Sequence, residues 1–412
     1  MEQKKHRDRS FLFLLIAVAC ALIFGFTGLL LPESFRTGAL ELVMSPLQSI
    51  FYRLIGTLAG PMIFLSVVLG IVNIGDAATL GKLGKRMIFA FVGITALLAA
   101  IAVGVSALFY RLPLAPVSGG SSQAKALSEL LVDLFPQSIV GPFASGNTLQ
   151  VIVLALLVGI AMLLLGSRVA GVVKLLEELS FIVQKLMGGL SRVMPVYVFL
   201  ALCKLIWNGS LSGFAGIWTF PLLFIGLTLA ATAALFLITA ARVRVSPFRL
   251  LRKGLKPFLI ALTTGSSTAA LDEIFATCEK RYGIDRSLTR FGVPLALVMY
   301  KTSSVLFLGT LGCYFASAYG LTVSPGWLLT AGFMAVVLTF AIPPVPGGGI
   351  NNYTVLFLQL GLPEAGLALA FAADSMMEYF ITGFNVLCQS AELLCLAEKV
   401  GLADENALKS QD

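Results

Sequence analysis

The sequence predicts an all-α polytopic membrane protein, and three observations support this fold class. Of the 412 residues, 58% are hydrophobic and only 12% are charged, whereas soluble proteins are about one quarter charged. Apolar runs of about 20 residues, the length that spans a bilayer, recur along the chain. The basic residues gather between those runs, as in "GKLGKR", which is the pattern of cytoplasmic loops. The net charge of +8 therefore reflects membrane orientation, and nucleic acid is not an expected partner.

Six of eight expected spanning helices lie in the first part of the chain. Their expected ranges are about 11–31, 47–74, 86–112, 148–166, 170–207 and 215–241. The first apolar run is longer than that of a cleaved signal peptide, so it is expected to be retained. The fifth is expected to form one long helix that contains Pro195. The basic loops place both termini on the cytoplasmic side of the plasma (inner) membrane.

The remaining part of the chain predicts two re-entrant helical hairpins of opposite orientation. In the first, about 256–283, a small polar stretch interrupts an apolar run that returns to a basic, cytoplasmic segment. In the second, about 327–361, "AIPPVPGGGINN" interrupts the run. Spans seven and eight, about 289–318 and 365–397, follow the hairpins. Each break alone also fits a kinked spanning helix, but their inverted sidedness favours hairpins, which are typical of secondary transporters.

A stripe of polar side chains runs along the eighth span. Its members are spaced 4, 4, 3, 4 and 3 residues apart: Asp374, Glu378, Thr382, Asn385, Gln389 and Glu392. On a helix these positions fall within an arc of roughly 80°, so the stripe is expected to line a cavity. The alternative is an acidic face that serves packing alone.

Lys301 lies in the middle of the apolar seventh span, "LVMYKTSSVLFLG". A charge at the bilayer centre costs about 3 kcal/mol on insertion scales, so a counter-ion is expected, supplied by Asp374 or Glu378. The expected charge network consists of Lys301, Thr302, Asp374, Glu378 and Gln389. Ser266, Ser267 and Thr268 form the first hairpin tip, where backbone N–H groups can bind an anion. Two tips around one polar stripe suit the binding of a small polar solute.

These landmarks, in this order, resemble the dicarboxylate/amino acid:cation symporter family, which has the glutamate transporter fold. The resemblance covers nearly the whole chain and includes "LAGPMIFLSVVLGI", "TTGSSTAAL", "VPLALVMYKTSS" and "PVPGGGINN". It implies a homotrimer embedded in the lipid bilayer. It also implies a scaffold formed by residues 1–82 and 141–210. A transport domain of residues 83–115 and 211–400 would carry the solute across like an elevator.

The resemblance also implies a solute site. Its residues would be Ser266, Ser267, Thr268, Lys301, Val345, Gly347, Gly349, Glu378, Ile381, Thr382 and Asn385. Ile381 stands where the family has an arginine for a side-chain carboxylate, which argues against aspartate or glutamate as the solute. Lys301 could supply the positive charge instead, so a monocarboxylate, a neutral amino acid and a dicarboxylate all stay open.

Two departures from the family concern sodium. Thr302 and Gln389 stand where relatives have sodium-binding aspartates, and Lys301 follows Tyr300 where relatives have Asn-Met. Hard cations prefer anionic oxygen sites, so sodium is disfavoured and a proton is the alternative coupling ion. No metal and no cofactor are expected. We hypothesise that Lys301 takes the electrostatic role of a coupling cation.

The expected function is secondary active transport (symport) of a small carboxylate or amino acid by an elevator mechanism. The alternative is a non-transporting relative that binds a solute or conducts anions. An enzyme is disfavoured, because the one histidine, His6, lies in the N-terminal tail and no catalytic set can be assembled around it.

Overall fold

The structure, a computed structural model, describes most of the chain. It covers residues 16–17, 19–73, 82–114, 135–145, 148–191, 193–207, 217–342, 350–363, 366–404 and 407–408. These residues are helices and their connections, and they contain no β-strand beyond two isolated bridges, Leu114 with Val323 and Ile284 with Ala403. The prediction of an all-α membrane protein is confirmed.

The helices follow the order expected from the sequence, and residues 19–28 are also helical. The labelled helices are α2 (Glu33–Ala39), α3 (Ser45–Asn73), α5 (Lys82–Phe109), α7 (Gly141–Ala144), α8 (Thr148–Leu165), α9 (Ala170–Ser191), α10 (Met194–Trp207), α11 (Thr219–Val243), α12 (Pro247–Thr264), α13 (Leu271–Ala276), α14 (Arg286–Met299), α15 (Thr302–Ala318), α16 (Pro325–Ala341), α17 (Ile350–Leu360) and α18 (Leu367–Lys399). Within the residues that the structure describes, five helical segments are long and apolar enough to cross a membrane.

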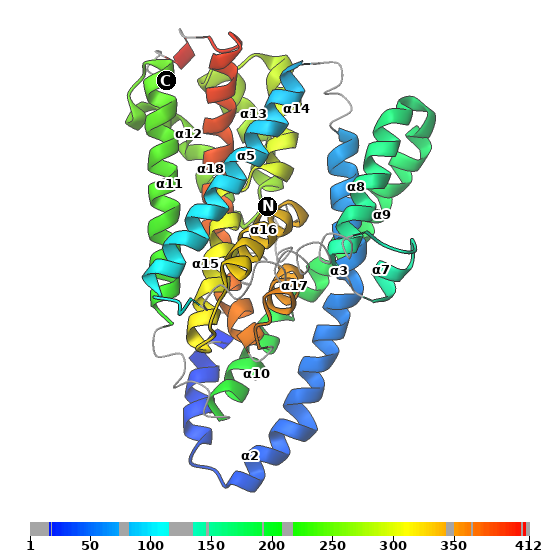
Figure 1. Cartoon of the computed structure of the whole chain (residues 1–412), viewed down its shortest axis with the longest axis vertical. Coiled ribbons are helices and arrows are strands. Elements are labelled where there is room, and N and C mark those ends of the chain that lie inside the picture. The colour runs from blue at the N-terminus through cyan, green and yellow to red at the C-terminus, as the bar shows by residue number, and fades with distance from the viewer. Residues whose placement is uncertain are drawn as a thin grey trace.

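The long helix α3 packs beside α8 and α9 (Figure 1). Their shared apolar core includes Val68, Val151 and Ala155. Helix α10 lies against the helix of residues 19–28, and the indole N–H of Trp207 donates to the Gly25 carbonyl at 2.9 Å. These helices come from the predicted scaffold ranges.

The other helices, α5 and α11 to α18, pack around α15 and α18 (Figure 1). The most apolar windows of the span-length segments Arg286–Ala318 and Met376–Lys399 are 82% and 83% buried inside the protein. The corresponding values are 33%, 22% and 28% for the other three. The seventh and eighth spans are therefore enclosed by protein, which allows them to carry polar groups at membrane depth.

One expected element differs from the structure. The predicted single helix over residues 170–207 is wrong, because α9 ends at Ser191 and α10 begins at Met194. Pro195 lies at the start of α10, where its missing N–H is tolerated; inside a longer helix its ring would clash with the carbonyl four residues earlier. Gly188 and Gly189 precede the break and lower the helix propensity further.

Candidate functional site

The seventh span is interrupted at its centre. Helix α14 ends at Met299 and α15 begins at Thr302, and the two residues between them are extended, Tyr300 at φ −122°, ψ 91° and Lys301 at φ −128°, ψ 77°. Such a break leaves the last carbonyls of one helix and the first N–H groups of the next without intrahelical partners. Inside a membrane these groups need partners from elsewhere in the protein.

Two stripe residues of α18 supply those partners. The Asn385 side-chain oxygen accepts a hydrogen bond from the Ser303 backbone N–H at 2.8 Å, and its amide donates to the Ser304 hydroxyl at 2.9 Å. The Gln389 amide donates to the carbonyls of Ala296 at 3.1 Å and Tyr300 at 2.7 Å. Asn385 therefore caps the start of α15, and Gln389 caps the end of α14.

Lys301 is buried, with 4% of its surface exposed. Its ammonium donates to the backbone carbonyls of Thr339, at 3.4 Å, and Ile342. Both carbonyls lie at the C-terminal end of α16, which carries a partial negative charge from the helix dipole. The structure therefore shows Lys301 bound to these carbonyls, and not in the expected ion pair with Asp374 or Glu378.

Asp374 finds its partner on the second hairpin. Its carboxylate accepts a hydrogen bond from the Tyr353 hydroxyl of α17, and both side chains are at least 95% buried. On the same helix, the Asn352 amide donates to the Leu338 carbonyl of α16 at 2.9 Å. These contacts join α16, α17 and α18 beside the break in the seventh span.

The tip of the first hairpin begins at Gly265, whose φ of +59° is accessible to glycine at little cost. The hydroxyls of Ser266 and Thr268 share a hydrogen bond of 2.7 Å, and Ser266 also accepts the Ala269 N–H at 3.3 Å. The ring of Tyr379 on α18 lies so close that a Cβ at Gly265 would meet it at 3.3 Å. The tip is thus packed directly against α18, beside the stripe residue Glu378 in sequence.

A cavity lies between this tip, the break and α18, with about 590 Å³ of empty space, part of it open to solvent. Six predicted solute-site residues line it: Ser267, Lys301, Glu378, Ile381, Thr382 and Asn385. Asp374 and Gln389 of the expected charge network also line it. Ser266 and Thr268 do not, and Thr302 is buried behind the wall. Val345, Gly347 and Gly349 lie outside the described residues.

Six further residues complete the wall and were missed from the sequence. They are Gly265, Leu297, Ser304, Phe307, Ile342 and Tyr353. Ser304 and Tyr353 offered a signal, since each carries a hydroxyl within an apolar helix. Leu297, Phe307 and Ile342 offered none, because an apolar residue in a membrane helix looks the same whether it faces a cavity or a neighbouring helix.

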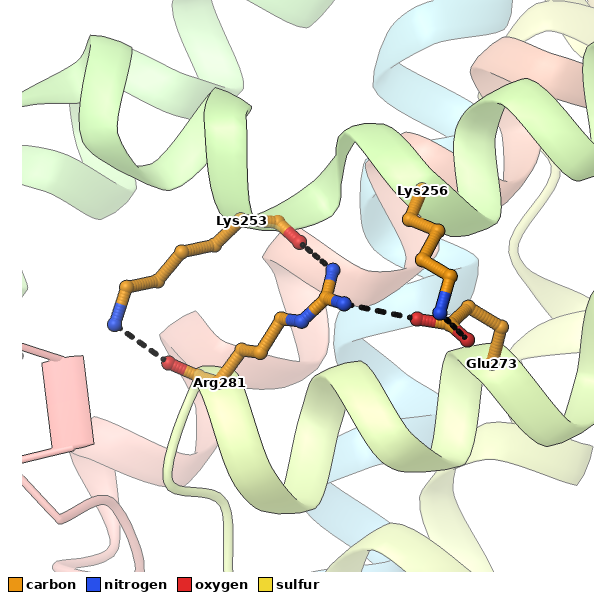
Figure 2. A network of polar contacts seen from close by, with 4 residues as sticks. All are labelled: Lys253, Lys256, Glu273 and Arg281. Atoms are coloured by element: carbon orange, nitrogen blue, oxygen red, sulfur yellow. Dashed lines mark hydrogen bonds and ion pairs between the residues drawn. The ribbon is translucent and has the colours of Figure 1, made fainter. Parts of the chain in front are cut away.

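The base of the first hairpin, away from its tip, is held by a charged network (Figure 2). Glu273 on α13 pairs with Lys256 on α12 at 2.7 Å and with Arg281 at 3.2 Å. The Arg281 guanidinium donates to the Lys253 carbonyl at 3.2 Å, and the Lys253 ammonium donates to the carbonyls of Arg281 and Ala407 at 3.2 and 2.6 Å. The network joins both halves of the hairpin to the C-terminal segment.

The cavity can bind a small polar solute. Hydroxyls, amides, carboxylates and one ammonium face it, together with apolar groups such as Phe307 and Ile381. Within the described residues, no group of three or more His, Cys, Asp or Glu side chains is arranged to hold a metal ion.

Comparison with known proteins extends the resemblance seen in the sequence. The chain is 27% identical over 423 residues to a C4-dicarboxylate transport protein of Solibacter usitatus, covering 99% of this chain and 96% of the relative. Proteins with the same name from Laribacter hongkongensis and Bacillus subtilis are 26% and 25% identical. They cover 100% and 95% of this chain, and 94% of each relative.

The pattern that defines the sodium:dicarboxylate symporter family matches residues 11–398, nearly the whole chain. A match of this extent identifies a membrane transport protein and not an enzyme. The chain belongs to the sodium:dicarboxylate symporter family.

Proposed function

We propose that the protein is a secondary active, elevator-type transporter of a small carboxylate across the plasma membrane. C4 dicarboxylates are the first candidate solutes, because the relatives named above are C4-dicarboxylate transport proteins. Monocarboxylates and neutral amino acids are the next candidates, since Ile381 replaces a family arginine that pairs with a side-chain carboxylate.

The observation that carries this proposal is the buried ammonium of Lys301 at the wall of a polar cavity. An ammonium has three N–H donors, and two of them are directed at the carbonyls of Thr339 and Ile342. The third is available for a solute carboxylate. The hydroxyls of Ser267, Ser304 and Thr382 would bind the remaining oxygens.

The elevator part of the proposal is supported by how the helices group. Helices α3, α8 and α9 pack together, and the cavity is formed by the first hairpin tip together with α14, α15, α17 and α18. Residues 1–82 and 141–210 would form the trimeric scaffold, and residues 83–115 and 211–400 would move with the solute.

Sodium is proposed not to be the coupling ion, because Thr302 and Gln389 lack the carboxylates of the family's sodium sites. Asp374 and Glu378 are the carboxyl groups that line the cavity, and intramembrane acids serve as proton relays in transporters. The transport cycle would thus be proton-coupled or independent of cations.

The experiment is uptake of labelled succinate, fumarate, lactate, alanine and aspartate into proteoliposomes under a sodium gradient, a proton gradient or neither. At least one solute is expected to enter without sodium, and Lys301→Met is expected to abolish its uptake. Lys204→Met is the matched control, since Lys204 on α10 contacts Ser45 at 3.0 Å, away from the cavity. Uptake that needs sodium and survives Lys301→Met would overturn the proposal. Solute binding without any flux would favour the non-transporting alternative.

A further inference from the structure

Two nitrogen donors in this chain each hold a pair of backbone carbonyls at the end of an interrupted helix. The Gln389 amide contacts the carbonyls of Ala296 and Tyr300 at the end of α14. The Lys301 ammonium contacts those of Thr339 and Ile342 at the end of α16. Both helix ends reach the cavity, whose wall includes Lys301, Ile342 and Gln389.

Converging carbonyls at a helix C-terminus form a site of negative potential, because the peptide dipoles add up along the helix toward that end. The carbonyls of Ala296 and Thr339 each also accept a backbone N–H, from Tyr300 at 2.9 Å and from Ile342 at 3.4 Å, and the side-chain nitrogens use their remaining lone pairs. Such a group of oxygens needs positive charge or N–H donors beside it. A hard metal cation could meet this need, provided that a carboxylate adds negative charge to the site. At these two positions the chain supplies side-chain nitrogen instead.

The residues present therefore do not fit sodium. The Gln389 amide directs N–H groups at the carbonyls of Ala296 and Tyr300, so a cation between them would be repelled by the amide. Lys301 brings a full positive charge to the carbonyls of α16, and it is 4% exposed. Thr302, beside the break, is 3% exposed and contributes a neutral hydroxyl.

We propose that Gln389 and Lys301 are built-in replacements for two bound cations, which hold the broken seventh span and the second hairpin together without sodium. Gln389 joins α18 to the end of α14, and Lys301 joins the break to the end of α16. The inference rests on the proposed function in one respect, since it assumes that ion coupling takes place at the positions of Gln389 and Lys301. The donor contacts that carry it belong to the fold and need no solute.

The test measures thermal stability and ²²Na⁺ binding of the purified protein in sodium, potassium or choline chloride at equal ionic strength, without solute. The wild type is expected to melt at the same temperature in all three salts and to bind no ²²Na⁺. Gln389→Asp places a shorter carboxylate opposite the two carbonyls and leaves room for an ion. This variant is expected to bind ²²Na⁺ and to gain a sodium-specific rise in melting temperature that grows with the logarithm of concentration.

Gln359→Asp is the matched control, because it makes the same chemical change at a half-buried position of α17 away from the four carbonyls. It is expected to respond to salt as the wild type does. Lys301→Met is a second variant, expected to lower the melting temperature and to be partly rescued by ammonium chloride but not by choline chloride. If Gln389→Asp does not fold, the recovery of the Lys301→Met melting temperature in ammonium chloride is the result that tests the inference.

Sodium-specific stabilisation of the wild type, or ²²Na⁺ binding by it, would overturn the inference whatever the variants do. A folded Gln389→Asp protein with the salt response of the wild type would overturn it as well. Because no solute is present, the two proposals fail separately. A wild type that binds sodium but takes up succinate without a sodium gradient contradicts this inference alone, and a sodium-indifferent wild type without any flux contradicts the proposed function alone.

Discussion

The Tyr353 hydroxyl of the second hairpin donates a hydrogen bond to the Asp374 carboxylate of the eighth span, and both side chains are almost fully buried. This contact links two segments that both line the cavity. It also gives a buried acid a neutral partner, while the nearby ammonium of Lys301 is bound to carbonyls. Asp374 and Lys301 are thus held by separate partners.

Tyr353→Phe removes the donor and leaves the buried carboxyl of Asp374 without its hydroxyl partner. A loss of about 1–3 kcal/mol in unfolding free energy is expected, since an unsatisfied buried polar group costs about that much. Thermal unfolding of the purified protein measures it. Tyr314→Phe is the matched control, because the Tyr314 hydroxyl is buried without a hydrogen-bond partner in the described structure. Equal melting temperatures for the two variants would contradict the importance of the Tyr353–Asp374 contact.

Asn385→Ala is expected to destabilise the start of α15. The substitution leaves the Ser303 N–H without the side-chain oxygen that accepts it at 2.8 Å, again at a cost of about 1–3 kcal/mol. Solute affinity, measured by isothermal titration calorimetry, should also fall because Ser304 and Lys301 lose their fixed positions. Ser304→Ala, which deletes only the second contact of Asn385, should be milder in stability. The opposite ranking would show that the backbone cap is not the important contact.

Lys253→Met is expected to release the C-terminal segment from the base of the first hairpin. The substitution deletes the donor to the Arg281 carbonyl (Figure 2) and to the Ala407 carbonyl. Carboxypeptidase digestion followed by mass spectrometry should then remove the C-terminal residues faster than in the wild type. Arg252→Met is the control, since Arg252 is the preceding residue of α12 and is exposed. Identical digestion of the two variants would contradict a role for Lys253 in holding this segment.

The cap of α14 predicts a pH dependence. The Ser287 hydroxyl and backbone N–H donate to the Asp285 carboxylate, and these hydrogen bonds hold the pKa of Asp285 below its ordinary value of 3.8. A lowered pKa in the folded state means that the stabilisation is present above pH 3.8 and is lost as the pH falls through the folded-state pKa.

Ser287→Ala, which removes the largest cause of that lowered pKa, should reduce the melting temperature slightly at neutral pH. The difference from the wild type should stay constant down to about pH 5 and shrink below about pH 4. Melting curves of both proteins between pH 7 and pH 3 measure it. A difference that widens with acidification would mean that the cap favours the protonated carboxyl.

Much of the fold could be predicted because its signals are local. The apolar runs, the basic loops and the two interruptions indicated an all-α membrane protein before any contact was known. Lys301 and the stripe on the eighth span were visible as polar residues in apolar surroundings. The division of residues 170–207 into α9 and α10 was missed, although Pro195 was a local signal for it.

The partners of the polar groups could not be predicted in the same way. Lys301 was expected beside a carboxylate, since opposite charges attract. The folded chain places it at the end of α16, where backbone carbonyls meet the same need. Which partner Lys301 finds depends on where α16 ends, since its contact Thr339 lies 38 residues further along the chain. No local sequence pattern indicates that contact.

The sequence by itself determined which polar side chains would lie at membrane depth, because each of them interrupts an apolar run of spanning length. Burying a polar group is costly, so its presence in such a run is informative. Only the tertiary structure decided what each one does. Hydrogen bonds act over about 3 Å, so the roles of Gln389 and Lys301 depend on helix ends brought together by packing. The family resemblance implied that aspartates are missing at Thr302 and Gln389, and the positions of Gln389 and Lys301 in the fold show which carbonyls these two residues hold.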